Sequence, residues 1–218
     1  MRFTRYFYEN AAAPFRETMR RIEAEESPFD NPPYDESGEP AYLEKWIEAS
    51  EALEMLGRSC ITMVSASLHL YVRTWERELE ICWRPGERKK AFNNGYLWGY
   101  RSFFEEVLDR SWSICPADLE VIEQIILARN RDQHPEEITT MRVKHGTADL
   151  KKHPRPVFMS ESDRDLLDDL DDQESEIAYW LNPSDYVSSD ALKAVISETE
   201  KLATWLEEHI LAFRYPVG

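Results

Sequence analysis

Apolar residues recur at three- and four-residue spacing along most of the chain, and this spacing predicts helices. One run extends from Leu43 to Cys82, and another from Leu192 to Phe213. Few stretches alternate between apolar and polar residues with the period of two that is typical of strands. The chain of 218 residues also contains only 7 glycines. These features predict an all-α fold with an up-and-down helical bundle.

The prolines and glycines divide this pattern into parts. A first helix is expected to begin near Pro14, because proline suits the first turn of a helix. A loop rich in proline follows over 27–40. We therefore predict an N-terminal arm and loop over 1–40 and a bundle domain over 41–218, with an irregular acidic insertion at about 160–185. Gly57 either separates two helices of the bundle or lies inside one long helix.

A segment over 83–99 contains Pro85 and several glycines, so we predict a connection there rather than a helix. Basic groups interleaved with aromatic rings can bind a single-stranded nucleic acid through charge and stacking. The same composition also fits a solvated loop that is held in place by its aromatic side chains. The basic residues are Arg88, Lys89 and Lys90, and the aromatic residues are Phe92, Tyr96 and Trp98.

The net charge of -16 opposes nucleic-acid binding, because each phosphate approaches against the field of the whole molecule. The charge is unevenly distributed, however. Residues 160–200 contain 13 acidic and two basic side chains, whereas basic clusters lie at 84–90 and 142–155. A local basic surface is therefore compatible with the acidic total. The acidic run over 161–176 is either a solvated face or a segment that mimics RNA and covers the basic clusters.

The cysteines and the apolar runs bear on the location of the protein. Cys60, Cys82 and Cys115 are odd in number and widely separated, which is typical neither of a disulfide framework nor of a zinc knuckle. No uninterrupted apolar run has the roughly 18 to 20 residues that span a bilayer. These observations predict a cytoplasmic protein that does not enter a membrane.

The strongest candidate for chemistry lies at the end of a predicted helix that begins at 116–118. Its apolar stripe contains Leu119, Ile122 and Ile126, and one further turn brings it to Arg129 and Asn130. His134 follows four residues after Asn130, so the two share a helical face. Pro135 then places the imidazole at a helix end, where a histidine can act as acid or base near neutral pH. An adjacent arginine can hold a phosphate.

The arrangement of Arg129, Asn130 and His134 at the end of an apolar helix resembles the signature of the HEPN superfamily (higher eukaryotes and prokaryotes nucleotide-binding). That signature is an arginine, an adjacent polar residue and a histidine a few residues later. The resemblance covers roughly 41–140. Many members are metal-independent endoribonucleases of toxin–antitoxin and other defence systems, in which two subunits bring two copies of the motif together.

The resemblance implies a homodimer that cleaves RNA without a metal or another cofactor, together with a possible antitoxin protein as partner. Arg129 would stabilise charge on the phosphate, His134 would perform acid–base catalysis at the ribose 2'-hydroxyl, and Asn130 would orient the reacting groups. The products would end in 2',3'-cyclic phosphate. Further RNA contacts are expected from Arg131, Arg88, Lys89 and Lys90.

Three other interpretations remain open at the level of sequence. Arginine and histidine near a helix C-terminus also complement the helix dipole, so the motif can be purely structural. The chain can also be a non-catalytic HEPN-like module that binds a nucleotide or a partner protein. Finally, His145 and His153 can bind a metal together with nearby carboxylates, although their spacing is not that of a tight metal motif.

Overall fold

The computed structural model describes residues 1–32, 38–80, 83–133, 143–168 and 183–215. Helices make up the regular elements within these residues, which confirms the predicted all-α class. An isolated antiparallel bridge joins Lys144 to Ser184. The α-helices are α1 (Arg2–Glu23), α2 (Leu43–Glu78), α3 (Glu87–Ala91), α4 (Tyr96–Leu108), α5 (Leu119–Gln133), α6 (Thr147–Lys152), α7 (Glu161–Asp168) and α9 (Ser189–Arg214), and the 3-10 helices are Phe92–Asn94 and Trp112–Ile114.

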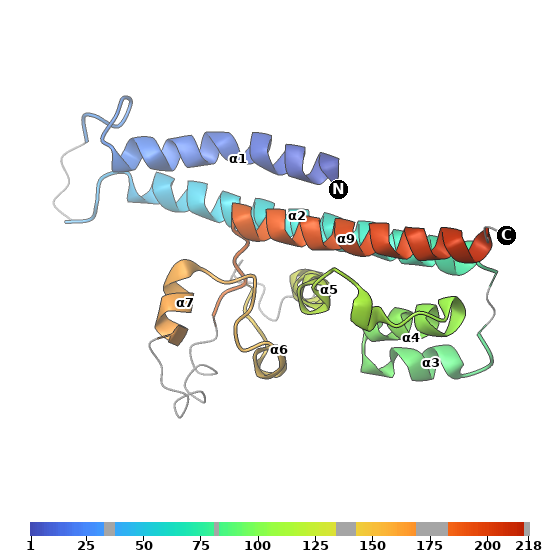
Figure 1. The fold of residues 1–218 in the computed structure, drawn as a ribbon. Helices are drawn as coiled ribbons and strands as arrows, with labels where there is room; N and C mark the ends of the chain where they lie inside the picture. Colours follow the sequence, from blue (N-terminus) through green and yellow to red (C-terminus); the bar gives the residue numbers. More distant parts are fainter. Residues whose placement is uncertain (33–37, 81–82, 134–142, 169–182, 216–218) are drawn as a thin grey trace.

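Three long helices, α1, α2 and α9, lie side by side along one direction (Figure 1). Helix α5 is seen nearly end-on beneath them, so it crosses their direction while it packs against α2 and α9 (Figure 1). Helix α4 lies beside α3 and also contacts α5 and α9. The core forms where these helices meet, and its largest fully buried side chains include Tyr100, Phe104 and Trp112. Helix α5, which carries Arg129 and Asn130 near its C-terminus, therefore packs against two of the three long helices.

Helix α1 begins at Arg2 rather than near Pro14, so the predicted start was wrong. Pro14 lies inside the helix. The residues before it remain helical because Tyr8 and Ala12, one turn apart, are buried in the core. Burial of this apolar pair outweighs the backbone hydrogen bond that a proline inside a helix removes.

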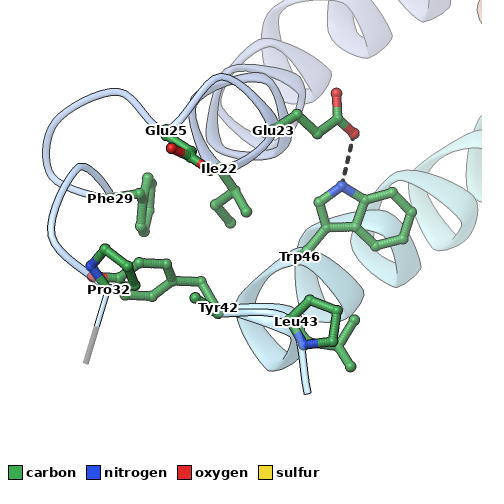
Figure 2. Close-up of a pocket in the computed structure, with 10 residues that line it drawn as sticks. Ile22, Glu23, Glu25, Phe29, Pro32, Tyr42, Leu43 and Trp46 are labelled. Atoms are coloured by element: carbon green, nitrogen blue, oxygen red, sulfur yellow. Dashed lines mark hydrogen bonds between the residues drawn. The ribbon is translucent and has the colours of Figure 1, made fainter. Parts of the chain in front are cut away.

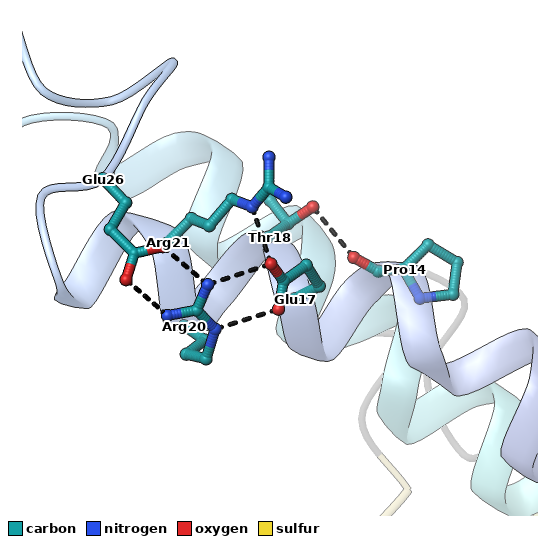
Figure 3. Close-up of polar contacts among 6 residues, drawn as sticks. All are labelled: Pro14, Glu17, Thr18, Arg20, Arg21 and Glu26. Atoms are coloured by element: carbon teal, nitrogen blue, oxygen red, sulfur yellow. Dashed lines mark hydrogen bonds and ion pairs between the residues drawn. The ribbon is translucent and has the colours of Figure 1, made fainter.

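The two arginines near the C-terminal end of α1 are paired with carboxylates of the helix and of the turn that follows it (Figure 3). Arg20 donates to Glu17 and Glu26 at 2.7–2.9 Å, and Arg21 donates to Glu17 at 2.7 Å. Hydrogen bonds from Arg20 and Arg21 lower the pKa of Glu17 to about 2. These arginines are satisfied within the helix end and its turn, and do not form a free basic patch.

Residues 43–78 form one helix, so Gly57 lies inside α2 and does not separate two helices. The segment just before α9 crosses α2 at this glycine and leaves no room for a side chain. A Cβ atom at Gly57 would lie 2.8 Å from both the Cβ and the carbonyl oxygen of Val187. Only glycine lets the chain just before α9 pass so close to α2.

The predicted connection over 83–99 is partly helical, because it contains α3 and the first turn of α4. Helix α4 begins at Tyr96 after Gly95, whose φ of 112° favours glycine. Gly99 does not end the helix. A Cβ there would lie 2.6 Å from the ring of Phe92, so this glycine makes room for an aromatic side chain.

Side-chain caps stabilise the starts of α5 and α9. Asp118 Oδ1 accepts from the backbone N–H groups of Glu120 and Val121 at the start of α5. The hydroxyl of Ser188 accepts from the N–H of Ala191 at the start of α9. No helix within the described residues is both long enough and apolar enough to cross a membrane.

Candidate functional site

Arg129 and Asn130 lie in the last turn and a half of α5. Arg129 is partly buried and Asn130 is exposed. The Arg129 guanidinium donates to Asn130 Oδ1 at 3.1 Å, so the two side chains are held together. His134 and Pro135 lie outside the described residues, and the role of His134 stays a prediction.

The core-facing surface of α5 includes the expected Leu119, Ile122 and Ile126. It is wider than that row, because Ile125 and Ala128 are buried as well, and one further turn brings it to Asp132, whereas Asn130 is exposed. Asp132 accepts a hydrogen bond from Thr62 of α2 at 3.1 Å and lies 3.9 Å from Arg58 Nε. The polar end of the core row is thus satisfied by α2, and Asn130 is left facing outward.

Arg131 is mostly buried and is bound to two carboxylates. Its guanidinium lies 2.6 Å from Asp149 Oδ2 and 2.9 Å from Asp185 Oδ2. The side chain of Asp185 is only 2% exposed. Arg131 therefore ties α5 to α6 and to the segment before α9, with both ends of its guanidinium occupied.

Next to the motif, His69 of α2 stacks on Tyr96 of α4, with ring centroids 3.8 Å apart and planes at 7°. His69 thus makes a contact between helices α2 and α4. His69 Nε2 and the Tyr96 hydroxyl are buried, and neither has a hydrogen-bond partner within the described residues. Unpaired buried polar atoms are uncommon in folded proteins, so this ring pair is an unusual place in the structure.

Two positive charges act on this histidine. Burial, followed by the charges of Arg129 and Arg73, lowers the pKa of His69 to about 4. His69 is therefore neutral near pH 7. Arg73 lies one turn after His69 on α2, and so shares its face. Arg129 comes from α5, so the charges from two helices converge on one imidazole.

Farther along the same face of α2, Glu76 accepts from Trp83 Nε1 at 2.6 Å and from the Tyr100 hydroxyl at 2.7 Å. Arg88 Nε lies 3.5 Å from the same carboxylate. Among the residues predicted to contact RNA, Arg88 thus has an acidic partner. Lys89 and Lys90 are exposed on α3 and have no carboxylate partner in the described part of the chain.

The aromatic residues of the basic segment separate into two groups. Phe92 and Tyr96 pack against the core, which matches a segment held in place by its aromatic side chains. Trp98 is 40% exposed, and the Arg101 guanidinium lies 4.8 Å from the centre of its ring. Of the three rings, Trp98 is the one that presents a surface for stacking.

His145 and His153 are buried and face different partners. His145 Nε2 lies 2.6 Å from the carbonyl oxygen of Phe158, and His153 Nε2 lies 3.3 Å from Glu123 Oε2. Burial lowers the pKa of His145. No group of three or more potential metal ligands occurs in the described ranges. The contacts of these histidines hold the segment around α6 in place.

A separate hollow of about 620 Å³ lies at the turn between α1 and α2 (Figure 2). Apolar and aromatic side chains from both helices line it, and Trp46 Nε1 donates to Glu23 Oε1 across the helix pair at 2.8 Å. Glu25 also lines the hollow. With acidic groups at its wall, it suits an apolar or cationic group better than a phosphate. Its other lining residues include Ile22, Phe29, Pro32, Tyr42 and Leu43.

The described residues form an all-helical fold. Its candidate site contains the partly buried Arg129 of α5 and the neutral His69 of α2, which stacks on Tyr96 of α4. Comparisons of the chain with protein-family models, with curated proteins and with solved structures found no match in any of the three. The function is therefore argued from the chemistry of this site.

Sequence reasoning missed Arg73, and it did not connect His69 to the motif. A signal was present in the spacing, because His69, Arg73 and Glu76 recur at four- and three-residue steps on the face of α2 beside the one that carries Leu68 and Val72. Such a polar row inside a long helix predicts contact with another polar or aromatic face. It does not reveal which helix supplies that face.

The lowered pKa of His69 makes stability depend on pH. Between about pH 6.5 and about pH 4 the unfolded chain binds a proton that folded His69 resists, so the free energy of unfolding falls as the pH falls through this window. His69→Phe keeps the stack and removes the titrating group. We expect this variant to lose less stability than wild type on acidification, as measured by urea unfolding at several pH values.

The control for this prediction is a direct NMR titration of the imidazole. His145 also has a lowered pKa, so part of the acid loss will persist in the His69→Phe variant. A His69 pKa near the ordinary value of about 6.5 would contradict the prediction.

Proposed function

We propose that the protein is a metal-independent endoribonuclease of defence or toxin–antitoxin type, with a HEPN-like bundle that acts as a homodimer. Arg129, Asn130 and His134 form its active site in this proposal. The observation that carries it is the state of Arg129. This guanidinium is partly buried, binds Asn130, and has no carboxylate partner within the described residues.

An arginine without a carboxylate partner is informative in this protein. The chain has 42 acidic and 26 basic residues, so carboxylates are abundant. Its neighbour Arg131 is bound by two of them. A partly desolvated arginine that keeps its charge available can bind a phosphate and stabilise the negative charge of the transition state. The nearby His69 is neutral, so it adds no second positive charge beside the guanidinium.

The proposed reaction is an internal displacement at phosphorus. The ribose 2'-hydroxyl gives its proton to His134 and its oxygen attacks the adjacent phosphate. The bond to the 5'-oxygen of the next nucleotide breaks, and that oxygen takes a proton from a second copy of the histidine. The products are a 2',3'-cyclic phosphate and a 5'-hydroxyl. Arg129 stabilises the phosphorane and Asn130 orients the guanidinium, while no step requires a metal.

The test is cleavage of a structured RNA in the presence of EDTA by wild type, Arg129→Ala and His134→Ala. We expect wild type to release products with 2',3'-cyclic phosphate ends and each variant to be slower by at least about 100-fold, because general acid–base catalysis contributes about 10²–10⁴-fold. Asn130→Ala should lose less activity. Wild-type cleavage no faster than that of the variants, at high protein and low salt, would refute the enzymatic proposal.

The second candidate is a non-catalytic HEPN-like module that binds a nucleotide or a partner protein. The hollow at the α1–α2 turn favours the partner-protein form of this candidate, because it is of ligand size and lined mainly by apolar side chains, while its acidic groups disfavour the phosphate of a nucleotide. The cleavage experiment decides between the two candidates. Absence of cleavage by folded wild-type protein leaves the binding module as the better proposal.

A further inference from the structure

Three aromatic side chains surround the hollow at the α1–α2 turn (Figure 2). The rings of Phe29 and Tyr42 have centroids 4.9 Å apart and planes at 69°, so their faces form a corner rather than a stack. Trp46 lies one turn after Tyr42 on α2, and its indole N–H donates to Glu23 Oε1 at 2.8 Å. This hydrogen bond ties the third ring to the end of α1. The hollow is thus lined by rings that are held from both sides of the turn.

The chain already places a cation on two of these rings. The Lys45 ammonium lies 5.7 Å from the centre of the Phe29 ring and 5.8 Å from that of Tyr42. Both distances are within the roughly 6 Å at which the negative face of an aromatic ring attracts a positive charge. Lys45 does not itself line the hollow. The ring pair therefore attracts an ammonium group, and the hollow leaves space beside the rings for one from outside the chain.

Acidic groups at the wall of the hollow add to this attraction. Glu23 and Glu25 line it, and no lysine or arginine does so within the described residues. The neighbouring Glu26 is bound by Arg20, whereas Glu25 is exposed and has no basic partner in the described part of the chain. An unpaired carboxylate beside the rings favours a ligand with a positive charge.

The backbone at Tyr42 is unusual for a helix start. Tyr42 is the N-cap of α2 with φ of 60°, and its side chain makes no capping hydrogen bond. N-caps are usually small polar residues, and bulky residues rarely adopt this left-handed conformation. The Tyr42 hydroxyl instead donates to the carbonyl oxygen of Asn31 at 3.0 Å, which holds the ring beside Phe29. A strained residue whose ring lines a hollow is typical of a ligand site.

We propose that this hollow binds the side chain of a trimethylated lysine on a partner protein. A methylated ammonium carries its charge inside an apolar surface, so it loses less hydration among rings and aliphatic groups than a bare ammonium does. Ile22 and Leu43 also line the hollow and supply apolar contacts for the lysine stem. The volume of about 620 Å³ lies within the roughly 300–1,000 Å³ usual for ligand sites.

A side chain presented by another protein suits this hollow better than a free small cation. The α1–α2 turn lies at one end of the molecule (Figure 1), and Pro32 and Pro40 at the wall of the hollow are exposed. The backbone of a partner can therefore stay outside while its lysine enters. Asp30 and Glu44, which are exposed next to lining residues in the chain, favour a basic segment around that lysine. The site deepens the partner-protein candidate and does not depend on the nuclease.

The test is an NMR titration of the full chain with a short capped peptide, Gly-Ser-Lys-Ser-Gly, whose lysine is trimethylated. We expect the signals of the Trp46 indole N–H and the Glu25 backbone N–H to shift as the peptide binds. A second peptide, in which carbon replaces the trimethylammonium nitrogen, has the same shape without the charge and should bind about tenfold more weakly. Equal affinity for the two peptides, or binding of neither, would overturn the proposal.

Variants of the wall test where the peptide binds. Glu25→Gln should weaken binding about threefold, whereas Glu48→Gln makes the same change in charge at an exposed position of α2 away from the hollow and should have no effect. Tyr42→Asn removes the ring but keeps a residue that accepts a positive φ, so we expect lost binding with an unchanged circular dichroism spectrum. Lys45→Met removes the competing ammonium and should tighten binding. Equal effects at positions 25 and 48, or weaker binding by Lys45→Met, would contradict the proposed site.

Free choline and RNA cleavage separate this site from the other proposals. Choline that binds as tightly as the trimethylated peptide would show that the ligand is a small cation and overturn the assignment to a partner protein. Peptide binding by a protein that does not cleave RNA would support this site and refute the nuclease. Cleavage without peptide binding would refute this site alone.

Discussion

Gly57→Ala is expected to destabilise the protein by about 1–3 kcal/mol, the usual range for an added methyl in a packed site. At most helical positions the same change stabilises, because alanine is the better helix former by about 1 kcal/mol. The sign is reversed here because the new Cβ would lie 2.8 Å from the backbone oxygen of Val187 as well as from its Cβ. Urea unfolding followed by far-UV circular dichroism measures the change.

Two further variants test this explanation. Ser67→Ala places a methyl on the exposed side of the same helix, and its stability should stay within about 0.5 kcal/mol of wild type. Val187→Gly combined with Gly57→Ala removes one of the two clashing atoms, so the two effects should not be additive. A Gly57→Ala variant that is more stable than wild type would contradict the close approach of the segment before α9.

Arg131→Met is expected to have the largest effect on stability, a loss of about 3–5 kcal/mol. The substitution keeps an unbranched chain of similar length and removes the charge that faces Asp185 and Asp149. The side chain of Asp185 is 2% exposed, so its carboxylate would stay buried without a compensating charge. Its Oδ1 already has no hydrogen-bond partner within the described residues. Urea unfolding at neutral pH measures the loss.

The control is the exposed pair of Arg77 and Glu78, whose two side chains are 75% and 44% exposed. Arg77→Met should change stability by no more than about 1 kcal/mol, because water already solvates these charges. Arg131→Met combined with Asp185→Leu should recover much of the loss, since no buried charge is left alone at that position. Equal effects at positions 131 and 77 would refute a structural role for the buried pair.

These predictions also separate two roles for the basic residues near the motif. Arg131 was predicted from sequence to contact RNA, and the structure places both ends of its guanidinium on carboxylates. A loss of RNA binding in an Arg131 variant must therefore be compared with its loss of stability. Arg129 has no carboxylate partner within the described residues, so its variants separate binding from stability more directly.

Helical periodicity predicted much of the fold, and its errors have physical causes. The stripes from Leu43 to Cys82 and from Leu192 to Phe213 correspond to α2 and α9. The start of α1 was placed too late, because proline at the first turn is a local preference that tertiary burial of Tyr8 overrides. Gly57 was left ambiguous, and the segment that contains Gly99 was predicted to be a connection, because the roles of these glycines depend on Val187 and on the ring of Phe92.

The role of the candidate site stays a prediction. Arg129 and Asn130 lie near the end of α5, as the spacing of the apolar stripe predicts, and Arg129 donates to Asn130 Oδ1. The same spacing placed Asn130 on the core-facing row, whereas Asp132 occupies that row and binds Thr62. A shift of about one residue round the helix decides which side chain meets α2, and this shift depends on packing.

The sequence by itself determined that this protein is all-helical, which helices are long, and that Arg129 and Asn130 share a helix end. These are local properties of spacing. Only the tertiary structure decided that Arg131 is bound by carboxylates and that Asp132, rather than Asn130, meets Thr62 of α2. Arg131 and Asp185 are 54 positions apart in the chain, and only the folding of the segment before α9 onto the end of α5 brings their charges together.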